Sequence, residues 1–170
     1  MENTIIVTKR TQNTANLQYK NLKANAYLGE LGTTSLKQEG DKKTPIGLFG
    51  LGICFGTHKK EEINKKLKYI ELNSNLYWVD DISSKFYNQL VDITNIPKDW
   101  NSAEHLIDFK KQYEYAIEIL ANPENLPNRG SAIFLHCETG KPTLGCISIK
   151  KEEIVHLLDI IDEKTKILIQ

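Results

Sequence analysis

The chain has 170 residues, of which 40% are hydrophobic and 26% are charged, and its 22 basic residues balance its 22 acidic residues. This composition is typical of a soluble globular protein with one domain over residues 1–170, and it excludes a strongly basic surface for nucleic acid. Lysine-rich pieces such as HKKEEINKKLK also contain glutamate, so we interpret them as solvated faces. No internal repeat or low-complexity tract divides the chain.

The first half has several strand and turn patterns. Residues 4–9 (TIIVTK) predict an opening strand, and residues 25–32 (NAYLGELG) predict a strand that ends in a glycine turn. Residues 38–52 hold four glycines and one proline, which is typical of tight turns around a short strand. Residues 58–72 have mixed helical character, and residues 76–81 (LYWVDD) predict a short aromatic strand.

The second half alternates strands with one clear helix. Residues 101–120 begin with polar capping candidates and lead into an apolar strand near 113–120. Residues 131–136 (SAIFLH) and 165–170 (TKILIQ) also predict strands. Residues 150–162 predict a helix, because four apolar residues recur on one helical face: Ile154, Leu157, Leu158 and Ile161. The fold class that follows is mainly β, of the α+β type.

No targeting or membrane segment is visible. The N-terminal residues carry an acidic residue at position two and only a short apolar run, which does not fit a signal peptide. No stretch approaches the ~18 consecutive apolar residues of a membrane span. We therefore expect a cytoplasmic protein, or a periplasmic or extracellular one if a leader precedes residue 1. The three cysteines lack CxxC spacing, so we expect free thiols: Cys54, Cys137 and Cys146.

One histidine and one cysteine flank a loop near the C-terminus. His136 ends an expected strand and Cys146 begins the next element, with CETGKPTL between them. If this loop turns the chain back, the two side chains come close together. A thiol with an ordinary pKa near ~8.5 needs a neighbouring imidazole to take its proton before it acts as a nucleophile. A buried cysteine beside a structural histidine has the same spacing, so both readings stay open at this point.

The residues around this pair have different expected roles. Gly145 lets substrate approach the backbone closely, and the amides of Gly145 and Cys146 are candidate donors to an oxyanion. Cys137 directly follows His136 and is therefore expected on the opposite face of the strand, where it is less suited as a nucleophile. Cys54 stands in a glycine-rich apolar stretch and is expected in the core.

Five blocks, in this order and spacing, carry a resemblance to a known family: GDKKTPIGLFGLG, YWVDDISSKFYNQLV, SAEHL, NRGSAIFLH and PTLGCISI. Together they resemble the YkuD-type L,D-transpeptidase domain, in a branch with a short His-to-Cys loop that includes cytoplasmic L,D-carboxypeptidases. The resemblance covers the chain from about Asn3 to its end. It implies a twisted β-sandwich-like fold with the cysteine at the base of a cleft. It also implies acyl transfer on peptidoglycan stem peptides, with cleavage after the L-centre of meso-diaminopimelate and release of the D-residue at position four.

The resemblance also implies site residues. Cys146 corresponds to the nucleophile, His136 to the general base, and Gly145 with Cys146 to the oxyanion hole. The third partner of this histidine in the family is usually a backbone carbonyl, so no acidic triad member is expected. Asp41, in the GDKKTP turn, is expected to be structural. Five further residues match recurring blocks and are expected to bind substrate or to support the cleft: Arg129, Ser131, Trp78, Asp80 and Asn88.

Two positions depart from the family pattern. Many relatives have a second histidine just before the Gly-Cys pair and Arg or Asn two residues after the cysteine, where this chain has Leu144 and Ser148. The missing histidine argues against transfer to a bulky amine. Muropeptides that return to the cytoplasm are small and soluble. We therefore predict an L,D-carboxypeptidase of murein recycling, which removes the terminal D-alanine of tetrapeptides through a thioester.

Other functions remain open. The alternatives are an exported L,D-transpeptidase that has lost its leader, a wall-degrading effector, and a non-catalytic sensor of peptidoglycan fragments. Papain-like hydrolases are disfavoured because their cysteine precedes the histidine. The expected partners are muropeptides, with no nucleic acid and no membrane, and the protein is expected to be a monomer. The four histidines lie apart in the sequence without an HExxH pattern, so no metal or other cofactor is expected. They are His58, His105, His136 and His156, and His156 is expected to be structural.

Overall fold

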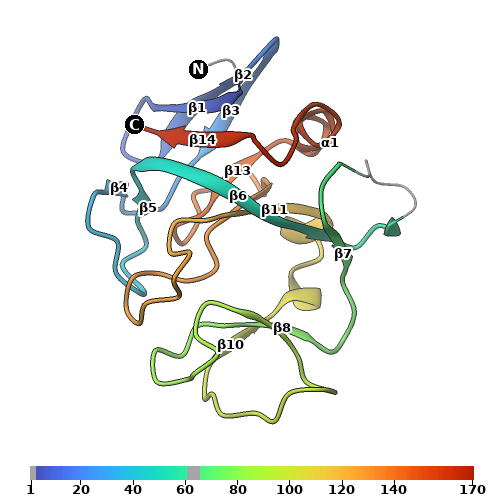
Figure 1. The fold of residues 1–170 in the computed structure, drawn as a ribbon. Coiled ribbons are helices and arrows are strands. Elements are labelled where there is room, and N and C mark those ends of the chain that lie inside the picture. The colour runs from blue at the N-terminus through green and yellow to red at the C-terminus, as the bar shows by residue number, and fades with distance from the viewer. Residues whose placement is uncertain (1–2, 61–65) are drawn as a thin grey trace.

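Strands dominate the part of the chain that the computed structural model describes, residues 3–60 and 66–170 (Figure 1). The helical elements there are α1 (Lys151–Ile160) and the short 3-10 helices η2 (Leu106–Phe109) and η3 (Gln112–Glu114). The strands are β1 (Thr4–Lys9), β2 (Thr14–Tyr19), β3 (Leu22–Tyr27), β4 (Thr33–Thr34), β5 (Thr44–Pro45), β6 (Gly47–Gly56), β7 (Tyr69–Glu71), β8 (Leu76–Val79), β9 (Leu90–Asp92), β10 (Ala103–His105), β11 (Tyr115–Ile119), β12 (Phe134–Cys137), β13 (Ile147–Ile149) and β14 (Lys166–Ile169).

The large sheet closes on itself. Its nine strands follow the order β11-β12-β13-β3-β2-β1-β14-β6-β7, and β6 additionally pairs with β11. β1 and β14 are parallel neighbours, so the first and last strands of the chain lie side by side (Figure 1). A separate three-stranded sheet, β10-β8-β9, lies at the bottom of the same view. This architecture confirms the expected mainly β fold.

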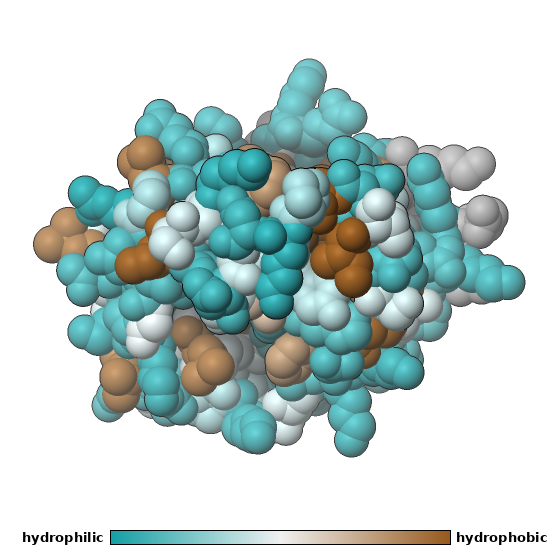
Figure 2. Space-filling view, turned by 90° about the horizontal axis from the view of Figure 1, so that it is seen from below, coloured by the Kyte–Doolittle hydropathy of each residue, from teal (hydrophilic) through white to brown (hydrophobic). Residues whose placement is uncertain are grey.

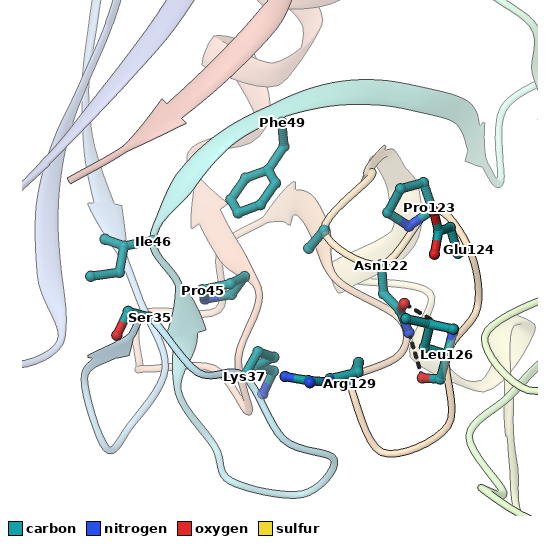
Figure 3. Close-up of a pocket in the computed structure, with 11 residues that line it drawn as sticks. Ser35, Lys37, Pro45, Ile46, Phe49, Asn122, Pro123, Glu124, Leu126 and Arg129 are labelled. Carbon is teal, nitrogen blue, oxygen red and sulfur yellow. Dashed lines mark hydrogen bonds between the residues drawn. The ribbon is translucent and has the colours of Figure 1, made fainter.

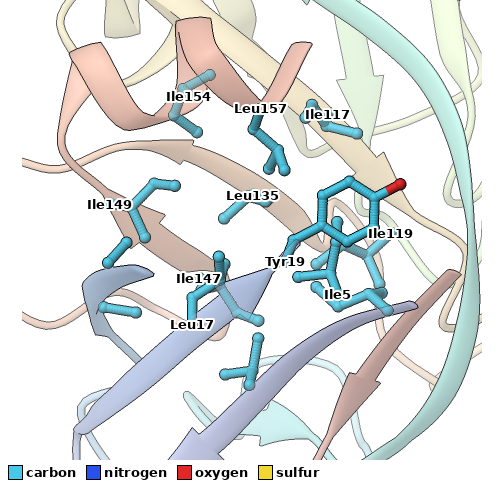
Figure 4. Close-up of a cluster of buried hydrophobic side chains, with 14 of the residues drawn as sticks. Ile5, Leu17, Tyr19, Ile117, Ile119, Leu135, Ile147, Ile149, Ile154 and Leu157 are labelled. Atoms are coloured by element: carbon cyan, nitrogen blue, oxygen red, sulfur yellow. The ribbon is translucent and has the colours of Figure 1, made fainter. Parts of the chain in front are cut away.

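The main core lies between α1 and the large sheet. Ile154 and Leu157 point from the helix toward Leu135 and Ile149 on the strands (Figure 4). All four side chains are fully buried. The apolar spacing predicted a helix over residues 150–162, and the structure has one over Lys151–Ile160. The buried face of this helix holds it against the sheet.

Most predicted elements are present, with differences at their ends. The strands expected at 4–9, 76–81 and 165–170 correspond to β1, β8 and β14. The strand expected at 25–32 is β3, which ends at Tyr27, and the one expected at 131–136 is β12, which begins only at Phe134. Ala132 has φ +52°, which is incompatible with an extended strand and explains the late start of β12.

Three segments differ more from the sequence-based expectation. β2 was not predicted, although its buried and exposed residues alternate. Residues 101–120 form β10, η2 and η3 before β11 begins. Of the mixed helical segment 58–72, residues 61–65 lie outside the described part, and its end forms the strand β7.

A cluster of aromatic side chains joins the small sheet to the large one. Trp78 of β8 meets Phe134 of β12 edge to face, with ring centroids 4.8 Å apart. Phe55 of β6 and Tyr113 of η3 lie edge to face with the same Phe134 ring, at 5.0 Å and 5.6 Å. These contacts hold β8 close to β12, and β10 stays near them because it pairs with β8.

The exterior is mixed in polarity. The face seen from below Figure 1 is mostly hydrophilic, and its hydrophobic residues gather in small separate groups (Figure 2). Within residues 3–60 and 66–170, no helix has the length and hydrophobicity needed to cross a membrane.

The helix contact predicts a measurable contrast. Leu157 is 0% exposed, whereas Val155 on the outer side of α1 is 36% exposed. Leu157→Ala should lower the free energy of unfolding by about 2–5 kcal/mol, because it leaves a cavity under the helix. Val155→Ala should lower it by less than about 1 kcal/mol. Urea unfolding monitored by circular dichroism measures both changes, and equal losses would contradict this packing.

Candidate active site

A cleft of about 660 Å³ contains both Cys146 and His136. Its walls come from separate parts of the chain: residues 37–42, β10 with η3, the segment leading into β12, and the loop before β13. The histidine and cysteine that the sequence pairs are therefore in one cavity.

The two residues meet through parallel strands. β12 and β13 pair in parallel with His136 opposite Ser148, so the intervening loop crosses over and does not form the simple turn back that the sequence predicted. Cys146 directly precedes β13 and lies beside Phe134, whose backbone N–H donates to Sγ at 3.3 Å. The thiol donates to the carbonyl of Ala132 at 3.2 Å. Parallel pairing thus puts both candidate groups on one face.

His136 is held as a neutral imidazole. Its ring is 7% exposed, and Nδ1 is 2.9 Å from the carbonyl oxygen of Cys137. A carbonyl only accepts hydrogen bonds, so Nδ1 carries the proton and Nε2 keeps its lone pair. Burial lowers the pKa of His136 to about 4, against the smaller opposing effect of the Cys137 carbonyl. The backbone partner matches the one that the family resemblance implies.

Cys146 is held as a neutral thiol. Burial raises its pKa to about 12, and the negative charge of Glu104 adds to this effect. The Phe134 N–H and the Lys37 ammonium act in the opposite direction. Among the described residues, the hydrogen bonds of the thiol go to Ala132 and Phe134 and none joins it to His136. The hydrogen bond to Ala132 must therefore break before the thiol proton can pass to His136.

The backbone before the thiol is fixed by two threonines. Thr143 Oγ1 donates to the Cys146 carbonyl at 2.7 Å and accepts from the Gly145 N–H at 3.1 Å. Thr44 Oγ1 also lies 3.3 Å from the Cys146 carbonyl. Gly145 has φ +140°, and a Cβ there would lie 3.1 Å from the Lys43 carbonyl, so glycine is required at this turn.

The expected substrate-binding residues separate into three groups. Ser131 and Asp80 line the cleft with Cys146. Trp78, 2% exposed, and Asn88 lie behind the cleft wall. Arg129 lines a neighbouring pocket of about 390 Å³, where it points toward Lys37 (Figure 3). Lys37 lines both cavities.

Asn88 connects the two walls of the cleft. Its Oδ1 accepts from Trp78 Nε1 and from the Ala132 N–H, both at 3.1 Å. Its Nδ2 donates to the Asn122 carbonyl and to Asn125 Oδ1, both at 3.0 Å. Asn88 also has φ +57°, a conformation that asparagine tolerates. It therefore positions the backbone whose carbonyl accepts from the thiol.

Three cleft residues were not singled out from the sequence. Glu104 lines the cleft and accepts from the hydroxyl of Tyr113 at 2.6 Å, and the edge of the Tyr113 ring contacts His136 at 5.6 Å between centroids. Lys37 forms an ion pair with Asp41, and its Nζ lies close to Gly145. Glu104 belongs to the block SAEHL. A carboxylate inside this short strand was the sequence feature that could have marked it as a cleft residue.

The remaining candidates lie away from the thiol. Cys137 and Cys54 are both buried in the main core. Asp41 stabilises its own turn, since it accepts from the Gln38 N–H at 3.0 Å and the Lys43 N–H at 2.9 Å. His156 is exposed on α1. Within the described part of the chain, no group of three or more His, Cys, Asp or Glu side chains is arranged to hold a metal ion.

Fold and cleft together define a mainly β protein with a half-buried thiol and an imidazole that line one cleft. The family model for the L,D-transpeptidase catalytic domain, YkuD, matches residues 2–169. The chain therefore belongs to the YkuD family, whose members are cysteine L,D-transpeptidases that act on peptidoglycan. Neither a curated protein nor a solved structure gave a significant match to the chain.

The Asn88 contacts predict a loss of stability on substitution. Asn88→Ala removes the acceptor and both donors and should lower the free energy of unfolding by about 1–3 kcal/mol. Asn88→Asp keeps the acceptor for Trp78 and Ala132 but sets a carboxylate oxygen against the Asn122 carbonyl, so it should cost at least as much. Asn88→Gly removes the same hydrogen bonds without backbone strain. Comparing it with Asn88→Ala separates the contribution of the hydrogen bonds from that of the positive φ. Urea unfolding measures all three, and a wild-type value for Asn88→Ala would contradict the bridging role.

The neutral thiol predicts how Cys146 reacts with iodoacetamide. Since its pKa is raised, the thiolate fraction and the alkylation rate should increase roughly tenfold per pH unit between about pH 6 and 9. Mass spectrometry of the Cys146 peptide measures the rate, with Cys146→Ser as the blank for the other two thiols. A rate that is already constant at pH 6 would indicate a thiolate-imidazolium pair instead.

Proposed function

We propose that this protein is a cysteine L,D-carboxypeptidase that removes the terminal D-alanine from peptidoglycan tetrapeptides in murein recycling, in the cytoplasm. The observation that carries the proposal is the thiol of Cys146 in one cleft with the proton-free Nε2 of His136, in a chain of the YkuD family. The neutral state of both groups favours base-assisted attack over a preformed ion pair.

The first half-reaction forms a thioester. His136 Nε2 takes the thiol proton, and Cys146 Sγ attacks the carbonyl carbon that joins the third residue to D-alanine. The new C–S bond leaves an oxyanion on the former carbonyl oxygen. When the oxyanion collapses, the C–N bond breaks, and His136 returns the proton to the departing amine of D-alanine. The peptide remains attached to Cys146 through its acyl group.

The second half-reaction releases a tripeptide. His136 Nε2 takes a proton from water, and the hydroxide adds to the thioester carbonyl. The C–S bond then breaks, the thiolate recovers the proton from His136, and the tripeptide leaves with a new carboxylate. The same base serves both steps because it is regenerated after each one.

The backbone near Gly145 is our candidate oxyanion hole. The Gly145 N–H is occupied by Thr143 Oγ1 before substrate binds, which supports the Cys146 amide as the principal donor. Participation of Gly145 would require this hydrogen bond to be exchanged for one to the oxyanion. Ser131 and Asp80 are candidates for substrate contact, Trp78 and Asn88 for support of the wall, and Arg129 for contact in the neighbouring pocket.

Two residues support water as the acceptor. Leu144 replaces the histidine of many relatives and is 72% exposed beside the cleft, so it offers no base for an incoming amine. Ser148 replaces a larger Arg or Asn, and it is 1% exposed. His136 is then the only imidazole among the described residues that line the cleft, and water is the smallest acceptor that it serves.

The proposal predicts the product formed from a disaccharide tetrapeptide. Wild-type protein should release D-alanine and leave the disaccharide tripeptide, which mass spectrometry detects. Cys146→Ala should abolish turnover while thermal unfolding stays close to wild type, since only the sulfur is lost. Cross-linked dimers as the main product would make an amine the acceptor, and turnover by Cys146→Ala would refute the mechanism.

A further inference from the structure

Two carboxyl groups share one wall of the cleft. Glu104 of β10 pairs with Trp78 of β8, so their side chains are on the same face of the small sheet. Asp80 is two residues beyond Trp78 and therefore points to that face as well. Both Asp80 and Glu104 line the cleft that contains Cys146. We call this pair of residues the acidic wall.

Among the described residues, none forms an ion pair with the acidic wall. Burial raises the pKa of Glu104 to about 7, and the charge of Asp80 adds to it, while only the Tyr113 hydroxyl opposes them. No ion pair found among the described residues includes Asp80 or Glu104. Three lysines line the same cleft: Lys37 is paired with Asp41 and Lys42 with Glu30, and no ion pair found among the described residues joins Lys141 to either carboxyl group.

Polar atoms in the cleft also lack hydrogen-bond partners. Asp80 Oδ1 is shielded from solvent and has no partner among the described residues. Ser148 Oγ, in a residue that is 1% exposed and lines the same cleft, has none either. Buried polar groups in proteins are normally hydrogen-bonded, so unpaired ones that line a cleft indicate contacts that a ligand completes. For a carboxylate the matching ligand group is a donor with positive charge.

We propose that Asp80 and Glu104 bind an ammonium group of the substrate, namely the free side-chain amino group of the diamino acid at position three. This inference rests on the proposed function, in which Cys146 attacks the carbonyl of that same residue. Glu104 lines the same cleft as Cys146, and its charge acts on the thiol, so a side chain that starts beside the scissile bond begins near the acidic wall. The acidic wall then selects peptides by the charge of their third residue, and it also orients the carbonyl toward Sγ.

The kinetic test compares two peptides that differ by one amino group. These are L-Ala-γ-D-Glu-L-Lys-D-Ala and the same peptide with norleucine in place of lysine. Wild-type protein should prefer the lysine peptide by about 10- to 100-fold in kcat/KM, the range expected for a hydrogen bond to a charged group. Glu104→Gln and Asp80→Asn should each lose most of this preference, measured as the ratio of the two kcat/KM values, because the effect of the lost charge on the Cys146 pKa acts on both peptides alike. Gln still accepts from Tyr113, so the fold of the wall is retained.

A matched control removes a different carboxylate of the same cleft. Glu30 lines the cleft but is paired with Lys42. Glu30→Gln should therefore keep the preference for the lysine peptide. Equal preference in wild type and in both acidic-wall variants would overturn the inference, as would a loss of preference in Glu30→Gln of the same size.

A second test does not depend on turnover. Aminoethyl methanethiosulfonate is a cation and methyl methanethiosulfonate is neutral, and both form a disulfide with a thiolate and release methanesulfinate. The rate at which Cys146 reacts with the cation, divided by its rate with the neutral reagent, reports the local charge. Cys146→Ser serves as the blank. Glu104→Gln and Asp80→Asn should each lower the ratio severalfold, and Glu30→Gln should lower it less.

The two tests separate the two hypotheses. If no tetrapeptide is hydrolysed but the ratio falls in both acidic-wall variants, the proposed function fails and a cation-binding wall stands. If tetrapeptides are hydrolysed and the ratio is unchanged in both variants, the inference fails and the proposed function stands. A lower ratio without any preference for lysine would also overturn the inference, because the wall would then not recognise the third residue.

Discussion

The parallel pairing of β12 with β13 is the constraint on which the site depends. Alternation along β12 directs His136 to the cleft and Cys137 to the main core, although the two residues are adjacent. On β13, Ser148 faces the cleft and Ile147 faces the core. Cys146, one residue before the strand, then lies beside the backbone of Phe134. A shift of one residue in this pairing would exchange the cleft and core side chains.

The apolar surroundings determine the protonation states of the pair. Both the imidazole and the thiol are neutral because burial penalises the charged form of each. The Cys137 carbonyl fixes the tautomer without supplying a full negative charge, so it orients His136 and leaves its basicity low. A thiolate-imidazolium pair is therefore not the resting state of the two groups.

Local patterns in the sequence predicted the elements that local physics determines. β1 and β14 have short apolar runs and α1 has an amphipathic spacing, and all three formed where expected. β2 was missed because its apolar positions are only Ala15, Leu17 and Tyr19, separated by polar residues, and its strand state comes from pairing with β1 and β3. The spacing of His136 and Cys146 alone did not decide whether the pair is catalytic or structural. The agreement of distant sequence blocks with a family pattern was needed to predict a catalytic pair.

Long-range contacts account for what the sequence did not reveal. Glu104 and Lys37 reach the cleft from segments far from Cys146 in the chain, and no local pattern marks Lys37. Arg129 is close to Ser131 in sequence, but the turn at Gly130, with φ +91°, directs it into the neighbouring pocket. Asn88 shows the same effect, since its four hydrogen bonds go to segments that meet only in the folded chain.

The aromatic cluster couples the reacting side of the cleft to its acidic wall. Phe134 contributes its backbone N–H to the Cys146 thiol and its ring to Trp78 of β8. β8 in turn pairs with β10, which carries Glu104, so the distance between thiol and carboxylate is set by packed rings and a strand pair. Packed interiors resist small displacements. The packed core therefore fixes the width of the cleft between the Cys146 thiol and the acidic wall.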